Sequence, residues 1–142
     1  MTIDDIQKEI IDEFSVFDDW MDKYNYLIEI GKGLKGLDEK KKVKDYLIEG
    51  CQSKVWLYPE LNEGKIIFIA ESDAIITKGI VALLVRVLSD RTPEEIISSD
   101  LYFIDEIGLK QNLSPTRSNG LLSMVKQMKL YAIAFNARMK SV

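Results

Sequence analysis

Apolar residues recur at the spacing of an α-helix in two stretches near the N-terminus, and each stretch predicts one amphipathic helix. The first stretch consists of Ile3, Ile6, Ile10 and Phe14. Thr2 and Asp5 have the spacing of a capping box, which marks the start of this helix. The second stretch consists of Phe17, Trp20, Met21, Tyr24, Leu27 and Ile28. Gly31 or Gly33 ends the second helix, because glycine commonly follows the last helical residue.

The middle of the chain changes to the pattern of β-strands. Two segments rich in Val, Ile and aromatic residues, Val55–Tyr58 and Lys65–Ser72, predict two strands. The segment between them, Pro59–Gly64, contains Pro, Asn and Gly, which favour a turn. We therefore expect an antiparallel hairpin, with Tyr46–Ile48 as a candidate third strand.

Helical signals then continue to the C-terminus. A helix from Ala74 to Leu88, capped by Ser72 or Asp73, is apolar around most of its circumference and belongs in the core. Residues 92–95 have the capping box and proline of a short helix, and Ser114-Pro115 begins the last helix by the same logic. The buried stripe of the last helix is predicted to be Leu121, Leu122, Val125, Met128, Ala132 and Phe135. The fold class is therefore α+β, with a small antiparallel sheet packed against several helices.

Composition excludes several kinds of chemistry. The chain has 142 residues, the size of one domain, and we expect residues 1–142 to form it. It has one Cys and no His. An intramolecular disulfide, a Cys/His zinc site and any mechanism with a histidine base are therefore excluded. One cysteine cannot hold an iron–sulfur cluster alone, so we expect no resident metal.

Charge and hydropathy limit the partners. The net charge of −4 argues against a nucleic-acid partner. The most apolar stretch, from Ala74 to Leu88, is too short for a membrane span and carries Lys78 and Arg86, so we expect no membrane partner. No secretory signal pattern is visible, and the cysteine has no partner in the chain, so we expect a cytoplasmic protein.

Charge is unevenly distributed along the chain. Residues 1–31 have a net charge of −7, whereas residues 107–142 have a net charge of +6. One interpretation is that the two ends lie together in the fold, and the other is that the C-terminal segment presents a basic surface to a partner. The lysine-rich segment, residues 40–44, is predicted to be a solvated face. Trp20 and Trp56 are predicted to be core residues, since both lie in regular elements.

Cys51 is the one side chain with distinctive chemistry. It follows Gly50, which gives the backbone freedom to turn, and precedes Gln52 and Ser53, which are polar. This setting predicts a loop at the rim of the sheet, where a thiol reaches a partner. The alternative is an inert, buried cysteine, which is common for an unpaired cysteine.

Sulfur exchange is one of the few reactions that this composition permits. It requires an attacking thiolate, a leaving group and access, and no histidine. A nearby cation increases the ionised fraction of a thiol. Lys54 is close to Cys51 in sequence, and Arg117 is a candidate to lie close in space.

Four segments of the chain, in this order and at this spacing, resemble the SufE-like proteins. They are Trp20-Met21-Asp22-Lys23-Tyr24, Gly50-Cys51-Gln52-Ser53-Lys54-Val55-Trp56, Ser72-Asp73-Ala74 with Lys78-Gly79, and Leu113-Ser114-Pro115-Thr116-Arg117-Ser118-Asn119-Gly120, with Thr92-Pro93 before the last. The resemblance extends from about Phe14 to Phe135. It implies the α+β fold that this family shares with NifU-like scaffold proteins.

The resemblance also implies a function in iron–sulfur cluster assembly. A SufS-like, pyridoxal-phosphate-dependent cysteine desulfurase would hold sulfur as a persulfide, and Cys51 would accept it by thiol–persulfide exchange. The chain would thereby stimulate the desulfurase and pass the sulfur to a SufBCD-like scaffold complex. The chain itself would need no cofactor and would act as a sulfur carrier rather than as a standalone enzyme.

The roles of the other matched residues are hypotheses. Arg117 contacts the partner or the persulfide charge, or else forms a surface salt bridge. Asp73 gates the cysteine loop, or else caps the following helix. Gly50, Gln52 and Ser53 shape the loop.

Two other functions are considered, and the oligomeric state is open. The chain is a non-catalytic adaptor that activates the desulfurase allosterically, or a structural module with a buried cysteine. The sequence is compatible with a monomer or a homodimer. In the carrier hypothesis Cys51 is sheltered against apolar surface at rest, because an exposed persulfide is easily lost, and docking turns the loop outward.

Overall fold

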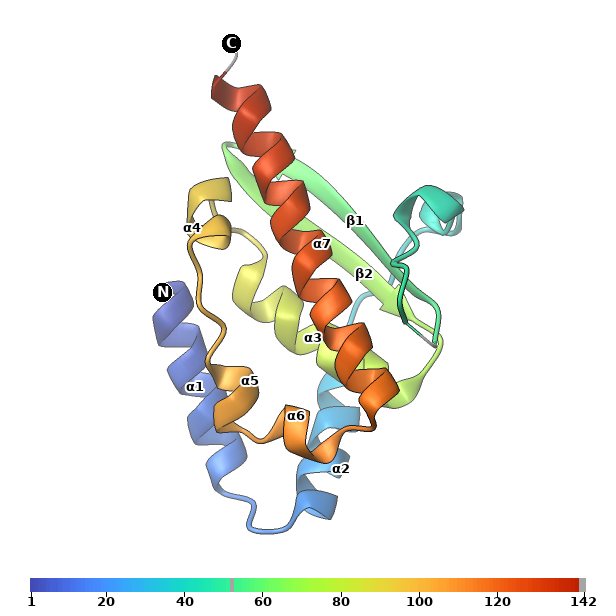
Figure 1. Cartoon of the computed structure of the whole chain (residues 1–142), viewed down its shortest axis with the longest axis vertical. Helices are drawn as coiled ribbons and strands as arrows, with labels where there is room; N and C mark the ends of the chain where they lie inside the picture. The colour runs from blue at the N-terminus through green and yellow to red at the C-terminus, as the bar shows by residue number, and fades with distance from the viewer. Residues whose placement is uncertain (52, 141–142) are drawn as a thin grey trace.

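The chain folds as an antiparallel β-hairpin surrounded by α-helices, which confirms the α+β prediction (Figure 1). The computed structural model describes residues 1–51 and 53–140. The helices are α1 (Ile3–Ser15), α2 (Trp20–Lys32), α3 (Ile75–Leu88), α4 (Pro93–Ile97), α5 (Phe103–Glu106), α6 (Leu109–Asn112) and α7 (Pro115–Lys140). The remaining elements are the strands β1 (Val55–Asn62) and β2 (Lys65–Ser72) and the 3-10 turns η1 (Glu39–Lys41) and η2 (Lys44–Tyr46).

The hairpin is longer and its turn tighter than the sequence predicts. β1 and β2 pair along their whole lengths, so the turn consists only of Glu63 and Gly64. Both residues have positive φ, 52° and 80°, as a two-residue hairpin turn of type I′ requires. The prediction of Pro59–Gly64 as the connector is wrong, because β1 continues to Asn62. Pro59 is tolerated because proline fits an edge strand, where its missing N–H is not needed for pairing.

The predicted third strand is also wrong. Within Tyr46–Ile48, the first residue ends the turn η2, and Leu47 forms only a lone bridge with Trp56. The backbone N–H of Ile48 donates to the carbonyl of Val55 at 2.8 Å. The chain therefore touches β1 once and then turns toward the cysteine loop.

Helix α3 contributes eight buried residues to the core, as its sequence predicts. It crosses α2 at backbone contact. A Cβ atom added to Gly31 would lie 2.7 Å from the backbone nitrogen of Gly79, and one added to Gly79 would overlap the carbonyl of Leu27. Only glycine permits two helix backbones to approach this closely.

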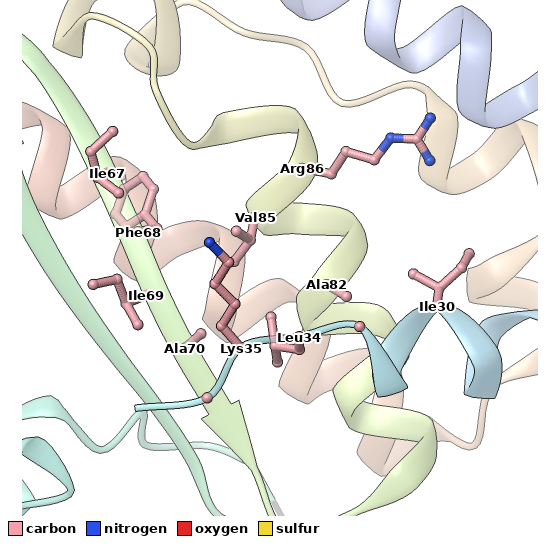
Figure 2. Close-up of a pocket in the computed structure, with 12 residues that line it drawn as sticks. Ile30, Leu34, Lys35, Ile67, Phe68, Ile69, Ala70, Ala82, Val85 and Arg86 are labelled. Atoms are coloured by element: carbon pink, nitrogen blue, oxygen red, sulfur yellow. The ribbon is translucent and has the colours of Figure 1, made fainter. Parts of the chain in front are cut away.

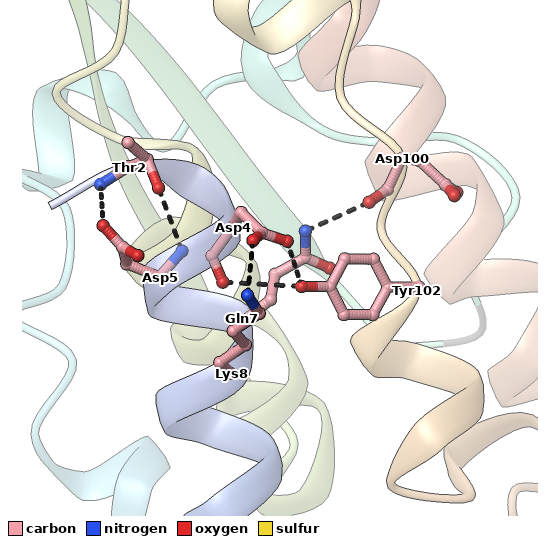
Figure 3. Close-up of polar contacts among 7 residues, drawn as sticks. All are labelled: Thr2, Asp4, Asp5, Gln7, Lys8, Asp100 and Tyr102. Atoms are coloured by element: carbon pink, nitrogen blue, oxygen red, sulfur yellow. Dashed lines mark hydrogen bonds and ion pairs between the residues drawn. The ribbon is translucent and has the colours of Figure 1, made fainter.

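A buried glutamine attaches α1 to the segment before α5 (Figure 3). The side-chain amide of Gln7 donates to the carbonyl of Asp100 at 3.0 Å and accepts from the N–H of Phe103 at 3.1 Å. Gln7 is 2% exposed, and both ends of its amide are paired, as burial requires. The predicted capping box of Thr2 and Asp5 is confirmed in the same view.

Helix α7 passes in front of α3 and the hairpin in the view of Figure 1, and α2 extends beyond its N-terminal end. Its start is confirmed, because Ser114 Oγ accepts the N–H of Arg117 at 3.3 Å. Its buried stripe differs from the prediction, since Leu122 is 50% exposed while Gly120 and Met124 are buried. None of the described helices combines the length and apolar character needed to cross a bilayer.

The lysine-rich segment is solvated only in part, because Lys40 and Lys44 are exposed whereas Lys41 and Lys42 are half-buried. Lys41 Nζ lies 3.8 Å from the ring centroid of Tyr58, and Lys42 Nζ lies 6.0 Å from that of Trp56. Lys42 also forms an ion pair with Glu71 of β2, and its side chain is 19% exposed. Trp56 therefore lies on the outer, lysine-covered face of the hairpin, and its predicted place in the core is wrong.

Several ion pairs of the acidic and basic ends are made with other parts of the chain. Glu9 and Glu13 of α1 bind Arg86 of α3, at 2.8 and 2.5 Å. Lys110 of α6 lies 3.7 Å from Asp105, and Lys140 of α7 lies 3.9 Å from Glu94, both outside the acidic segment. Whether the two ends of the chain lie together stays a prediction.

The α2–α3 crossing predicts a sharp effect of one methyl group. Gly79→Ala should lower the free energy of unfolding by about 2–3 kcal/mol, because the overlap with the Leu27 carbonyl outweighs the better helix propensity of alanine. Urea unfolding followed by circular dichroism measures this change. Gly33→Ala is the matched control, since its added Cβ would lie 3.4 Å from the Ile30 carbonyl. Equal stabilities for the two variants would contradict the backbone contact.

Candidate functional site

Cys51 lies half-buried at the edge of a small cavity between the first turns of α3 and α7. The cavity has a volume of about 60 Å³, enough for a few atoms rather than for a substrate of ordinary size. Its lining residues are Cys51, Ser53, Thr77, Ile80, Thr116, Arg117, Gly120 and Met124. The structure thus brings three predicted site residues, Cys51, Ser53 and Arg117, to one place.

The thiol packs directly on the backbone of α7. Cys51 Sγ lies 3.6 Å from the carbonyl oxygen of Gly120 and donates a hydrogen bond to it. A Cβ atom added to Gly120 would lie 3.3 Å from Sγ, closer than side chains ordinarily pack. Gly120 is therefore part of the site, and its place at the end of the fourth resembling segment is explained by this contact.

Gly50 lets the chain enter the site. Its φ is +89°, a left-handed conformation that favours glycine. A Cβ atom at this position would also lie 2.6 Å from Ser123 Oγ of α7. The backbone before Cys51 is therefore held against the same helix as the thiol.

Asp73 fastens the other end of the cysteine loop. Its Oδ1 accepts the N–H of Lys54 at 3.1 Å, and its own N–H donates to the Lys54 carbonyl at 3.3 Å. The alternative role as a helix cap is wrong, because the N-cap of α3 is Ala74, whose own N–H donates to Ser72 Oγ at 3.3 Å, and no side chain caps the helix. Asp73 thus holds Lys54, the residue just before β1, in a fixed place.

The two remaining predicted residues are Gln52 and Arg117. Gln52 lies outside the described residues. The side chain of Arg117 is exposed and lines the cavity. Within the described part of the chain, no carboxylate lies within ion-pair distance of its guanidinium. The alternative of a surface salt bridge for Arg117 therefore finds no support, and its charge is available to the cavity.

Thr77 is a site residue that sequence reasoning missed. It is 6% exposed and lines the cavity as the third residue of α3. Its hydroxyl has no hydrogen-bond partner among the described residues, and it is not one of the unpaired polar atoms that are fully buried, which are Trp20 Nε1 and Arg91 Nε. The sequence offers one signal for Thr77 as a site residue: it is a polar residue in an apolar helix, two positions before Gly79.

Two electrostatic effects act in opposite directions on the charge of the Cys51 sulfur. Burial raises the pKa of the Cys51 thiol, so the resting thiol is less ionised than a free cysteine. The first turns of α3 and α7, which carry partial positive charge, and the Arg117 side chain border the same cavity. The site therefore suits a neutral thiol at rest and a place where negative charge on sulfur is accommodated.

No group of three or more potential metal ligands occurs among the described residues.

Comparisons with known proteins show the family of the chain. A family model described as SufE: Fe-S metabolism associated domain matches residues 8–132. The chain belongs to the SufE family. Membership implies a role in Fe–S metabolism and a partner from that pathway. The matched range contains Cys51 and every residue that lines its cavity.

Two curated relatives and one solved structure extend the comparison. An uncharacterized SufE-like protein of Rhizobium etli is 43% identical over 126 residues, covering 85% of each chain. One of Rhizobium meliloti is 37% identical over 126 residues, covering 85% of this chain and 90% of the relative. The solution structure of a hypothetical protein from Thermus thermophilus has a TM-score of 0.74 at 18% identity, covering 91% of this chain and 94% of the other. That last likeness supports the fold.

The burial of Cys51 predicts a pH dependence. The rate of alkylation by iodoacetamide should rise with pH to a midpoint higher in the native protein than in the urea-denatured chain, because burial disfavours the thiolate. Intact-mass analysis across a pH series measures both midpoints on the same thiol. A native midpoint at or below the denatured one would contradict the sheltered resting state.

The contact with Gly120 predicts a second change in reactivity. Gly120→Ala should speed alkylation of Cys51, because the added methyl displaces Sγ and removes its hydrogen bond to the carbonyl. Fold stability should not fall by more than about 1 kcal/mol, since alanine is the better helix former. Asn119→Ala, at the exposed neighbouring position, is the control. Unchanged alkylation in Gly120→Ala would refute the proposed importance of this contact.

Proposed function

We propose that the chain accepts persulfide sulfur from a cysteine desulfurase onto Cys51 and passes it on for Fe–S cluster assembly. The observation that carries this proposal is the position of the chain's one thiol. It lies in a cavity bordered by two helix N-termini and a guanidinium, in a protein of the SufE family. The cavity admits only a few atoms, which suits a single transferred sulfur better than a bulky substrate.

The transfer step is a balanced exchange. The Cys51 thiol first loses its proton to solvent water, and the thiolate attacks the terminal sulfur of the desulfurase persulfide. A sulfur–sulfur bond to Cys51 forms while the sulfur–sulfur bond in the desulfurase breaks, and its electron pair leaves on the desulfurase thiolate. The number of S–S bonds is unchanged, so no external oxidant or reductant is needed. Release of the desulfurase thiolate frees that enzyme for another turnover, which accounts for activation.

Three kinds of group around the cavity would stabilise the anionic persulfide that forms on Cys51. Arg117 supplies a positive charge, and the hydroxyl of Thr77 supplies a hydrogen-bond donor without a competing partner. The first turns of α3 and α7 add partial positive charge. These groups stabilise a persulfide on Cys51 without a histidine.

The attack requires the cysteine loop to move. Cys51 is half-buried against Gly120, where a partner's sulfur has little room. Gly50 supplies a flexible position on one side, and the two hydrogen bonds between Asp73 and Lys54 fix the other side. Docking of the desulfurase would turn the segment between these points outward, with Asp73 as the fixed boundary.

The proposal also includes the domain, the location and the partners of the chain. Residues 1–142 act as one domain in the cytoplasm, the donor is a SufS-like desulfurase, and the acceptor is a SufBCD-like scaffold complex. Family membership supports a pathway partner, and the cavity supports the chemistry at Cys51.

The test is the mass of the protein after reaction. Reduced chain is incubated with a cysteine desulfurase and L-cysteine, and intact mass is measured beside a Cys51→Ser control. We expect wild type alone to gain one sulfur atom and to accelerate desulfurase turnover.

Two other outcomes have distinct meanings. Acceleration that survives Cys51→Ser, without a mass gain in wild type, would replace the carrier with an allosteric adaptor. Neither mass gain nor acceleration, with a desulfurase shown to be active and to bind the chain, would refute both functions.

A further inference from the structure

Thr77 is an exception among the buried residues of α3, because the others are glycine or aliphatic residues. Where α3 borders the apolar groove that separates it from β2, it presents Ala82 and Val85 (Figure 2). A hydroxyl at a buried position of such a helix is unfavourable unless it finds a hydrogen-bond partner. The question is therefore which group the Thr77 hydroxyl serves.

The hydroxyl of Thr77 is unpaired and opens to the Cys51 cavity. Thr77 is 6% exposed, and that cavity is the space that it lines. Its oxygen has no partner among the described residues, yet it is not one of the unpaired atoms that protein encloses completely. The oxygen therefore borders open space, and a group that enters the cavity can accept its hydrogen bond.

The backbone beside Thr77 offers further donors. Side-chain oxygens cap the N-termini of α1, α2 and α4, whereas no side chain caps α3. The first N–H groups of a helix have no partner within the helix itself. Asp73, which precedes the N-cap of α3, directs its Oδ1 to the N–H of Lys54 instead. The first turn of α3 thus combines uncapped N–H groups with an unpaired hydroxyl, and these are the groups that bind an anion.

The sulfur of Cys51 cannot keep its resting contact once it carries a negative charge. Its hydrogen bond to the Gly120 carbonyl uses the proton of the thiol. A thiolate and a carbonyl oxygen are both acceptors, so loss of the proton replaces attraction by repulsion. The anionic sulfur is therefore driven away from Gly120 and toward donors. In a persulfide, the added S–S bond of about 2.05 Å carries the charge further from the Cys51 backbone.

Among the described side-chain donors that line the cavity, Thr77 alone is buried. Thr116 and Arg117 are exposed, and Ser53 is half-buried. Water competes for the hydrogen bonds of exposed groups and weakens them. Arg117, the one charged residue of this lining, attracts an anion through space. The short hydrogen bond to the anion is left to the Thr77 hydroxyl.

We propose that the first turn of α3 is the receiving site for negative charge on the Cys51 sulfur, with the Thr77 hydroxyl as its donor. The sulfur then has two positions. The protonated thiol lies on the Gly120 carbonyl, and the thiolate or the terminal sulfur of a persulfide lies at Thr77. Thr77 is thus a further catalytic residue, at a position where valine would suit the apolar helix better.

The two charged forms of the sulfur arise at different stages. The thiolate binds at Thr77 in the free protein, without a partner. The persulfide forms only if Cys51 accepts sulfur, so its position at Thr77 rests on the proposed function. Both positions belong to the resting loop, before the desulfurase docks and after the loaded loop returns.

The thiolate is tested by alkylation of the free protein across a pH series. Thr77→Val removes the hydroxyl and keeps the shape of the side chain. It should raise the alkylation midpoint of Cys51 by about one pH unit, because the thiolate loses a hydrogen bond to its charge. Thr77→Ser should restore most of this shift. Thr116→Val, which removes an exposed hydroxyl from the same cavity, should shift the midpoint by less than half as much.

Thermal unfolding separates the hydroxyl from the packing of the side chain. Thr77→Val should be no less stable than wild type, since the hydroxyl has no partner to lose. An unchanged midpoint in Thr77→Val would overturn the proposal. A raised midpoint that Thr77→Ser does not restore, or that accompanies a lower melting temperature, would also overturn it, because packing would then place the loop.

Wild-type protein provides a test that needs no folded variant. In NMR spectra across the same pH series, the side-chain signals of Thr77 should shift with the midpoint of Cys51, and Cys51→Ser should abolish the shift. Thr77 signals that ignore the ionisation of Cys51 would contradict the receiving site.

The persulfide is tested on chain that a desulfurase and L-cysteine have loaded and that has then been purified. Cyanide attacks the terminal sulfur, which leaves as thiocyanate, and the electron pair of the broken S–S bond stays on the Cys51 thiolate. Thr77→Val should speed this loss about tenfold, because the sulfur is no longer held. Equal rates in the two proteins would refute the persulfide position. Failure of wild type to load would refute the proposed function, and the midpoint of the free thiol would still decide the role of Thr77.

Discussion

The backbone contact between α2 and α3 is the constraint from which the arrangement of the site follows. Gly31 and Gly79 let these helices meet without intervening side chains, and this fixes how α3 lies beneath the hairpin. Residues two positions apart on a helix face nearly opposite directions. Gly79 therefore faces α2, while Thr77 faces the Cys51 cavity. A hairpin of two strands is marginal alone, so its position also depends on this helix.

The cysteine loop is held at three points by three different kinds of contact. Before the thiol, Gly50 packs in a left-handed conformation. The thiol itself donates a hydrogen bond to the carbonyl of Gly120. After the thiol, two hydrogen bonds join Asp73 to Lys54. None of these contacts is strong individually, and none involves an ion pair. The loop can thus be well placed at rest and still be released when a partner offers competing contacts.

Much of the fold could be predicted from local patterns. Helical spacing, the capping boxes at Thr2 and Thr92, and the apolar character of α3 are properties of short segments and gave correct elements. The errors arose where tertiary contacts decide. Pro59 fits inside a strand because that strand is an edge, and Leu122 is exposed because the stripe of α7 passes through Gly120 and Met124 instead.

In the candidate site, too, local features could be predicted and tertiary contacts could not. The sequence placed Cys51 in a loop after a permissive glycine, which needs only local reasoning. It could not place Gly120 or Thr77 beside the thiol, because these residues lie 69 and 26 positions away and only the packing of α3 and α7 brings them there. For Asp73 the sequence left open a role in gating the cysteine loop or in capping α3, and only the structure shows its partner, the N–H of Lys54 just before β1.

Helix α7 also acts as a spacer. Gly120, which contacts the thiol, and Lys140 are twenty residues apart on one continuous helix, a rise of roughly 30 Å. The C-terminal end of the helix lies beside the hairpin tip, where Gly64 faces Met139. A fluorophore, an affinity handle or a sensor surface attached near that end is therefore remote from the thiol. Immobilised in this orientation, the molecule presents its reactive end to the solution.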